Sequence, residues 1–99
     1  MTSKETLKIY TNADLSAGSV SGQINVNRHD QIEFYGNTDG SGFIGIQVST
    51  DGVNYFSSSN TIHYDGSIYG RFPCYAPVLR LSFVSDMSGL TLNATLSGI

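Results

Sequence analysis

The chain carries little charge, since Lys, Arg, Asp and Glu make up 13% of its 99 residues, about half the share that is usual for soluble domains. Its five basic residues are scattered and its net charge is −3, which argues against a surface that tracks nucleic-acid phosphates. Tryptophan is absent, and a single cysteine, Cys74, excludes a disulfide within the chain. Such a weakly charged exterior suits a surface that lies against other protein copies or one that hydrogen-bonds a sugar.

Long apolar runs are also missing. The polar residues 1–5 are not followed by an apolar stretch, so we expect neither a secretory signal nor a membrane span, and no membrane partner. No window of about twelve residues shows a helical period, so we expect no significant helix. The chain is therefore interpreted as a protein made in a reducing cytoplasm.

What the sequence does contain is alternation of apolar with uncharged polar residues, the pattern of half-buried strands. The clearest cases are residues 20–27, 79–84 and 90–97. Three Asp-Gly pairs interrupt the pattern at 39–40, 51–52 and 65–66. Glycine accepts a positive φ and aspartate tolerates it, so each pair is expected to close a β-hairpin.

Strands at this spacing predict an all-β fold, namely a single-domain antiparallel β-sandwich of jelly-roll-like form with about eight or nine short strands. We expect this one domain to occupy residues 1–99, with residues 1–5 as a flexible N-terminal arm. Residues 57–60 are predicted to be a loop. Pro73 and Pro77 bound a break between strands, because proline cannot donate within a ladder.

No catalytic motif is present. Six of the eight acidic residues fall in predicted loops or turns, where aspartate serves turn chemistry. The spacing of His29 and His63 fits no metal motif, and no serine has a nucleophile-elbow context. Cys74 is expected to have a packing role. We therefore expect a non-enzymatic protein with no catalytic residues, no metal and no cofactor.

The aromatic residues are the best candidates for contacts with other molecules. Tyr35 alternates out of phase with Ile32 and Phe34, and Phe43 is out of phase with its apolar neighbours, so both should lie on an outer face. Exposed aromatic side chains are common in protein interfaces and in sugar stacking. The predicted interface or ligand contacts are Tyr35, Phe43, Tyr55 and Tyr64.

Two segments carry a resemblance to known proteins. Residues 47–56, Gln-Val-Ser-Thr-Asp-Gly-Val-Asn-Tyr-Phe, resemble a hairpin of small β-sandwich proteins of tailed phages. Residues 77–83 and 90–96 are similar in style to the closing strand pair of such virion proteins. The resemblance covers residues 42–96. It implies a virion component, either a head decoration (cement) protein or a neck, tail or fibre accessory.

The resemblance further implies a non-enzymatic capsid decoration protein that binds and stabilises the head shell of a bacteriophage. Its expected partners are copies of itself, with a trimer favoured and a dimer possible, and the phage major capsid protein, but no nucleic acid. Its expected location is the virion. The alternative is a carbohydrate- or receptor-binding β-sandwich module of a phage tail, fibre or other surface protein.

Overall fold

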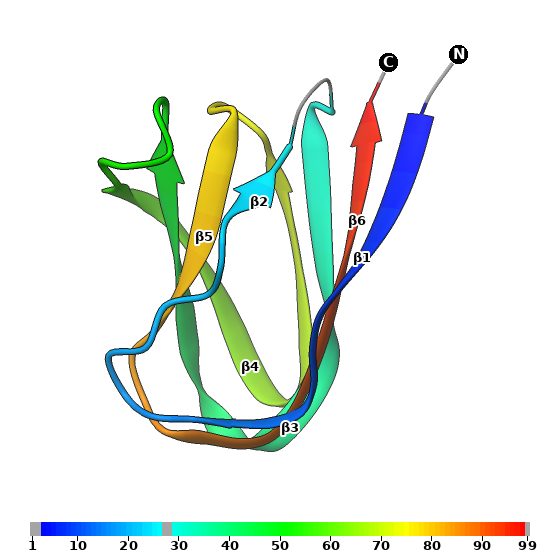
Figure 1. Cartoon of the computed structure of the whole chain (residues 1–99). Coiled ribbons are helices and arrows are strands. Elements are labelled where there is room, and N and C mark those ends of the chain that lie inside the picture. Colours follow the sequence, from blue (N-terminus) through cyan, green and yellow to red (C-terminus); the bar gives the residue numbers. More distant parts are fainter. Residues whose placement is uncertain (1–2, 27–28, 99) are drawn as a thin grey trace.

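A computed structural model describes residues 3–26 and 29–98, which form strands, turns and loops without a helix (Figure 1). The all-β prediction is therefore confirmed for this part of the chain, which also holds no helix long and apolar enough to cross a lipid bilayer. The described strands are β1 (Ser3–Leu15), β2 (Ile24–Asn25), β3 (Gln31–Ser49), β4 (Phe56–Pro73), β5 (Val78–Phe83) and β6 (Met87–Gly98).

The strands form one curled antiparallel sheet in the order β1-β6-β3-β5-β2, with β4 along the other side of β3. Residues 31–37 of β3 pair with β6, and residues 44–49 pair with β5. Figure 1 shows β3 and β4 following a U-shaped path together. We call β1, β6 and residues 31–37 and 67–73 the first arm, and β2, β5 and residues 44–49 and 56–62 the second arm.

The bend of the U lies at two of the three Asp-Gly pairs. The β3–β4 register shifts between Asn37 and Ser41, and there Gly40 (φ 85°) and Gly66 (φ 76°) have positive φ. Extra residues in one strand bend it and increase its twist. The expected hairpins at 39–40 and 65–66 are therefore wrong, because both pairs bend a continuous strand. Asp51-Gly52 does join β3 to β4 in a hairpin.

The core fills the space between the two arms. Alternate residues of β3, β4, β5 and β6 face inward, including Phe34, Ile44, Leu81 and Leu92, each of which is fully buried. Their partners in the alternation face outward and are mostly Ser, Thr, Asn, Gln and Tyr. Burial of this apolar face stabilises the curl, because each fully buried large apolar side chain contributes about 1.5–3 kcal/mol.

Other expectations need correction. The described residues form six strands rather than eight or nine, since β3 and β4 each merge two expected strands. A division into two sheets, as in a jelly-roll-like sandwich, is not confirmed. Of the expected flexible arm at residues 1–5, Ser3–Glu5 lie in β1 and pair with Leu96–Gly98 of β6, and residues 1–2 lie outside the described part. Residues 57–60, expected as a loop, belong to β4.

Candidate functional site

The predicted contact residues lie in different places. Tyr35 is on the outer face of the first arm, where its hydroxyl lies 3.1 Å from Thr95 Oγ1. Phe43 follows the bend in β3, is 54% exposed, and packs against the His63 ring with centroids 5.0 Å apart. Tyr64 is 2% exposed and belongs to the core, because it shares the inward face of β4 with Ile62.

Tyr55 lies in the β3–β4 hairpin under a basic side chain. The Arg80 guanidinium lies 3.9 Å from the centroid of the Tyr55 ring, and Arg80 Nε donates to Gln47 Oε1 at 2.7 Å. The Tyr55 hydroxyl is buried without a hydrogen-bond partner among the described residues. The predicted contact residues thus form no common site. Of the four, Phe43 is exposed, Tyr35 and Tyr55 are half-buried, and Tyr64 is buried.

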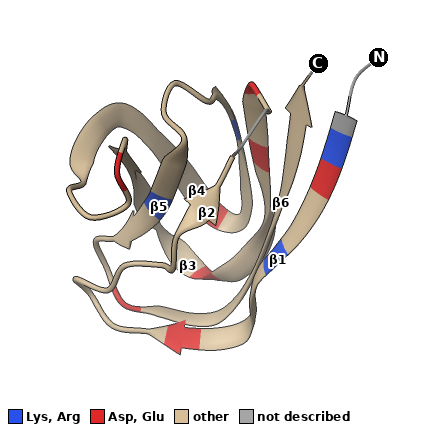
Figure 2. Ribbon diagram, turned by 45° about the horizontal axis from the view of Figure 1, so that its top comes forward, with Lys and Arg blue, Asp and Glu red and all other residues tan. Residues whose placement is uncertain are grey.

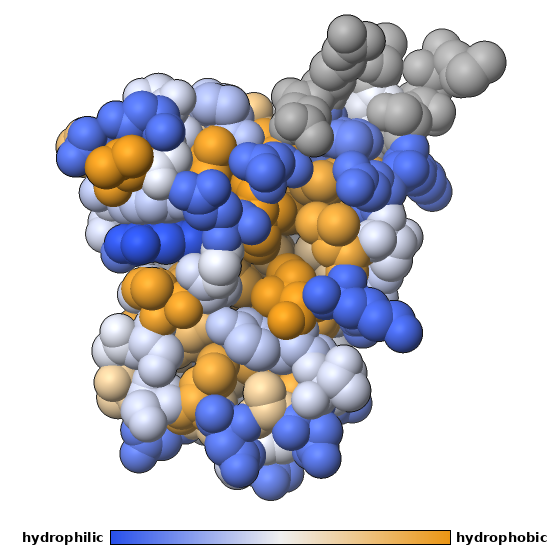
Figure 3. Space-filling model, viewed as in Figure 1, coloured by the Kyte–Doolittle hydropathy of each residue, from blue (hydrophilic) through white to orange (hydrophobic). Residues whose placement is uncertain are grey.

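β1 and β2, the end strands of the order β1-β6-β3-β5-β2, do not pair with each other. Between them is an opening of about 260 Å³, which we call the seam, lined by Leu7, Lys8, Ile9, Gly22, Gln23 and Ile24. Figure 3 shows apolar residues at the surface between β2 and β1. Leu7 and Ile9 are only partly buried, so the core reaches solvent at the seam.

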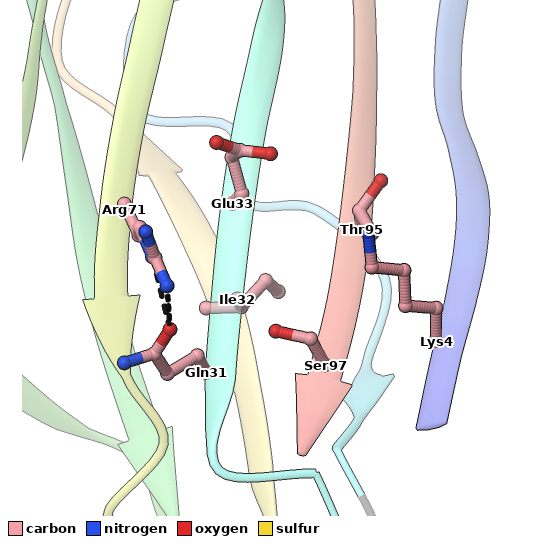
Figure 4. Close-up of a pocket in the computed structure, with 7 residues that line it drawn as sticks. All are labelled: Lys4, Gln31, Ile32, Glu33, Arg71, Thr95 and Ser97. Carbon is pink, nitrogen blue, oxygen red and sulfur yellow. Dashed lines mark hydrogen bonds between the residues drawn. The ribbon is translucent and has the colours of Figure 1, made fainter. Parts of the chain in front are cut away.

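A polar groove lies over β6 on the outer face of the first arm. Its volume is about 270 Å³, and Figure 4 shows the residues that line it: Lys4, Gln31, Ile32, Glu33, Arg71, Thr95 and Ser97. Ile32 is 1% exposed, so its side chain faces the core rather than the groove. The groove is therefore walled almost entirely by polar groups.

The groove arises from side-chain size. The outward residues of β6 are short, with Thr95 and Ser97 forming the floor, while Gln31 and Glu33 on β3 and Lys4 on β1 are long. Successive outward residues on neighbouring strands lie side by side in a sheet. Short side chains on β6, between longer ones on β3 and Lys4 on β1, leave a trough along this end of β6.

Hydrogen bonds fix the β3 and β4 sides of the groove. Arg71 Nε donates to Gln31 Oε1 at 2.9 Å, and Arg71 Nη2 donates to the same oxygen. The Tyr69 hydroxyl donates to Glu33 Oε2. This hydrogen bond raises the pKa of Tyr69, because the neutral phenol donates to a carboxylate whose negative charge disfavours phenolate.

No group of three or more His, Cys, Asp or Glu side chains that would hold a metal ion is found in residues 3–26 and 29–98. Cys74 is half-buried, and its main-chain N–H donates to the Asp30 carbonyl at 2.7 Å. Burial, reinforced by the nearby Asp30 charge, raises the pKa of its thiol to about 11. Cys74 is thus a protonated, weakly nucleophilic thiol at neutral pH.

The fold is shared with proteins of known structure. The chain is similar to the crystal structure of the SPBc2 prophage-derived protein YomS, with a TM-score of 0.70 and 10% identity over 99% of this chain and 96% of that one. It is also similar to a chain of Bacillus endospore appendages, described as a novel family of disulfide-linked pili, with a TM-score of 0.54 and 16% identity over 99% and 88% of the two chains. No protein-family model matches the sequence, and no curated protein matches it.

Sequence reasoning missed the groove residues Lys4, Arg71, Thr95 and Ser97. Alternation does place Thr95 and Ser97 opposite the inward Ala94 and Leu96. It does not reveal that β6 lies between β1 and β3, because those pairings join residues about ninety and sixty positions apart in the printed sequence. The groove depends on that strand order.

Proposed function

We propose that this chain is a non-enzymatic structural protein of a phage particle, and specifically a head decoration protein that binds the capsid as an oligomer. The fold similarity to a prophage-derived protein supports the phage origin. The similarity to a pilus subunit shows that this type of fold also occurs in an assembled filament. Neither comparison identifies a partner for this chain.

The observation that carries the proposal is the seam. Edge strands expose unpaired main-chain groups, and proteins usually cover, shorten or charge them. Here the opening between β1 and β2 exposes the core-packing residues Leu7 and Ile9. A segment of a second copy laid over the seam removes this apolar surface from water and can add main-chain hydrogen bonds.

Because the chain carries few charges, burying its surface against a neighbour costs little desolvation free energy. Figure 2 shows few charged residues on the strands, and taking an unpaired charge out of water is far more costly than burying a hydroxyl that keeps a hydrogen bond. Exposed apolar side chains add contact area away from the seam, with Val53 79% exposed and Phe56 65% exposed. Subunit and shell contacts on several sides fit a protein that is packed among neighbours.

The test is the mass of the purified protein in solution, measured by light scattering after size exclusion. We expect a discrete oligomer, a trimer or a dimer, and saturable co-sedimentation with expanded shells of the major capsid protein from the same phage. A strict monomer that does not bind such shells would contradict the proposal.

A matched pair of variants tests whether the seam is the interface. A Cβ at Gly22 meets no atom within 4 Å, so Gly22→Glu places a charge at the seam without a clash in the monomer. Ser59→Glu adds the same charge at an exposed position of β4. We expect Gly22→Glu to shift the protein to monomer and Ser59→Glu to leave the oligomer intact. An unchanged oligomer in Gly22→Glu would rule out the seam.

A further inference from the structure

The outer face of the first arm concentrates positive charge. Lys4 and Lys8 alternate with Thr6 on β1 and share its outer face, and Arg71 lies across the same face on β4. These are three of the five basic residues of a chain whose net charge is −3. In the described rows of paired residues between Lys4 and Lys8, Glu33 is the one carboxylate on the outer face, while Glu5 has the phase of the inward Leu96 and Ile32.

These cations are not neutralised by neighbouring carboxylates. Glu33 and Arg71 are paired across β3 and β4, yet Figure 4 shows their side chains pointing in different directions. Arg71 is held by the neutral Gln31 amide, and Glu33 accepts from Tyr69. Within the described residues, neither Arg71 nor Lys4 has an ion-pair partner. Both can therefore bind an anionic group of a ligand.

Between the cations lies a floor of hydroxyl groups. Ser97 and Thr95 line the groove, and the Tyr35 hydroxyl lies within hydrogen-bond distance of the Thr95 hydroxyl. Hydroxyls both donate and accept, so they match the alternating donors and acceptors of a sugar ring. Tyr69, 60% exposed, adds an aromatic side chain beside the groove. A partner protein is less well matched, because protein interfaces have an apolar centre that this groove lacks.

We propose that the groove over β6 binds an anionic oligosaccharide, a chain of sugars that carry carboxylates. In this arrangement Arg71 and Lys4 bind carboxylates, the Arg71 fork being suited to bidentate contact. Thr95 and Ser97 bind sugar hydroxyls. The groove volume of about 270 Å³ is near the lower end of ligand pockets, about 300–1,000 Å³, so a short polar segment fits it. This binding does not depend on the assembly role proposed above.

The probe is oligogalacturonate, titrated into the whole chain by calorimetry at low salt. The same oligosaccharide with its carboxylates methyl-esterified is the neutral control, and polyphosphate is the control for charge alone. We expect oligogalacturonate to bind and the ester to bind at least about tenfold more weakly, since hydrogen bonds to charged groups are the stronger ones. Equal binding of acid and ester, stronger binding of polyphosphate, or no binding would overturn the proposal.

Variants locate the site. Arg71→Gln and Lys4→Gln should each weaken oligogalacturonate binding about tenfold. Arg80→Gln removes the same charge as Arg71→Gln, but Arg80 lies on the second arm. The affinity of this variant for oligogalacturonate should therefore match that of the unaltered protein. Affinity that is unchanged in both groove variants would overturn the assignment to this groove. Binding by a monomer would leave this inference standing and contradict the assembly proposal, so the two fail separately.

Discussion

The two arms of the sheet share β3 and β4 but present different outer faces. On the first arm the outward residues of β3 are Gln31, Glu33 and Tyr35, and each makes a polar contact with a neighbouring strand. Just after the bend Phe43 packs against His63, and on the second arm Gln47 holds Arg80 over the Tyr55 ring. The outward side of β3 is thus polar and hydrogen-bonded before the bend, and after it lies beside the ring contacts of Phe43 with His63 and of Arg80 with Tyr55.

This difference separates the two proposed roles. The inward residues of β3 are alike in both arms, with Ile32 and Phe34 before the bend and Ile44 and Ile46 after it. Burial in the common core constrains the inward positions, whereas the outward positions are free to differ. The polar face suits a hydroxylated ligand, and the aromatic face suits packing against protein.

The largest expected effect comes from two phenylalanines of β3. Phe34 is fully buried in the first arm, and Phe43 is 54% exposed just after the bend. Phe34→Ala should lower the free energy of unfolding by about 3–5 kcal/mol, and Phe43→Ala by less than about 1 kcal/mol. Urea denaturation measures both, with Phe34→Leu as the milder variant if Phe34→Ala does not fold. Equal losses at the two positions would contradict the assignment of inner and outer faces.

A second pair of variants tests how closely β3 packs against β6. A Cβ at Gly36 would overlap the Thr91 carbonyl oxygen of β6, whereas a Cβ at Gly22 meets open space. Gly36→Ala should therefore cost about 1–3 kcal/mol or more, because the backbone of β6 must move. Gly22→Ala should be neutral or slightly stabilising. Thermal unfolding measures both, and a harmless Gly36→Ala would argue against the close packing of β3 on β6.

The smallest effect concerns the hairpin that ends the second arm. Asp51 accepts hydrogen bonds from the main-chain N–H groups of Asn54 and Val53 and from the side chains of Asn54 and Ser49, and these lower its pKa below the ordinary value of 3.8. A carboxyl group whose pKa is lowered by folding stabilises the folded state at pH values above its ordinary pKa. This contribution is lost as the pH falls through the pKa of the folded state. The melting temperature should therefore fall with acidification.

The control for this prediction is another Asp-Gly pair. Asp39 lies at the bend and accepts one long hydrogen bond, 3.4 Å from Ser88 Oγ. Asp51→Ala should lower the melting temperature at neutral pH and flatten its decline in acid, whereas Asp39→Ala should do neither. The same acid profile in all three proteins would show that the hairpin contributes no such linkage.

The Asp-Gly pairs also show how far the sequence predicts the fold. Alternation correctly identified inward residues such as Phe34, Leu81 and Leu92, because one buried face imposes a period of two. The three Asp-Gly pairs look alike in sequence, yet one closes a hairpin and two bend strands. A positive φ at glycine is compatible with both outcomes, and the distant strands β5 and β6 decide between them.

The candidate sites were less predictable. Exposed Phe43 followed from its phase in the alternation, but Tyr64 was predicted as a contact residue although it shares a phase with Ile62, and both are buried. The seam and the groove both depend on which strands are neighbours, and no local pattern encodes that β1 and β2 end the strand order. Lys4 and Arg71 line the same groove only because of that strand order.

The continuity of β3 and β4 through the bend has a mechanical consequence. A force that pulls the two arms in opposite directions acts along these strands. In a sandwich of separate sheets, such a pull is resisted by side-chain packing between the layers. Here two unbroken main chains run from one arm into the other, so covalent bonds share the load, and the arms should come apart only when the whole molecule unravels.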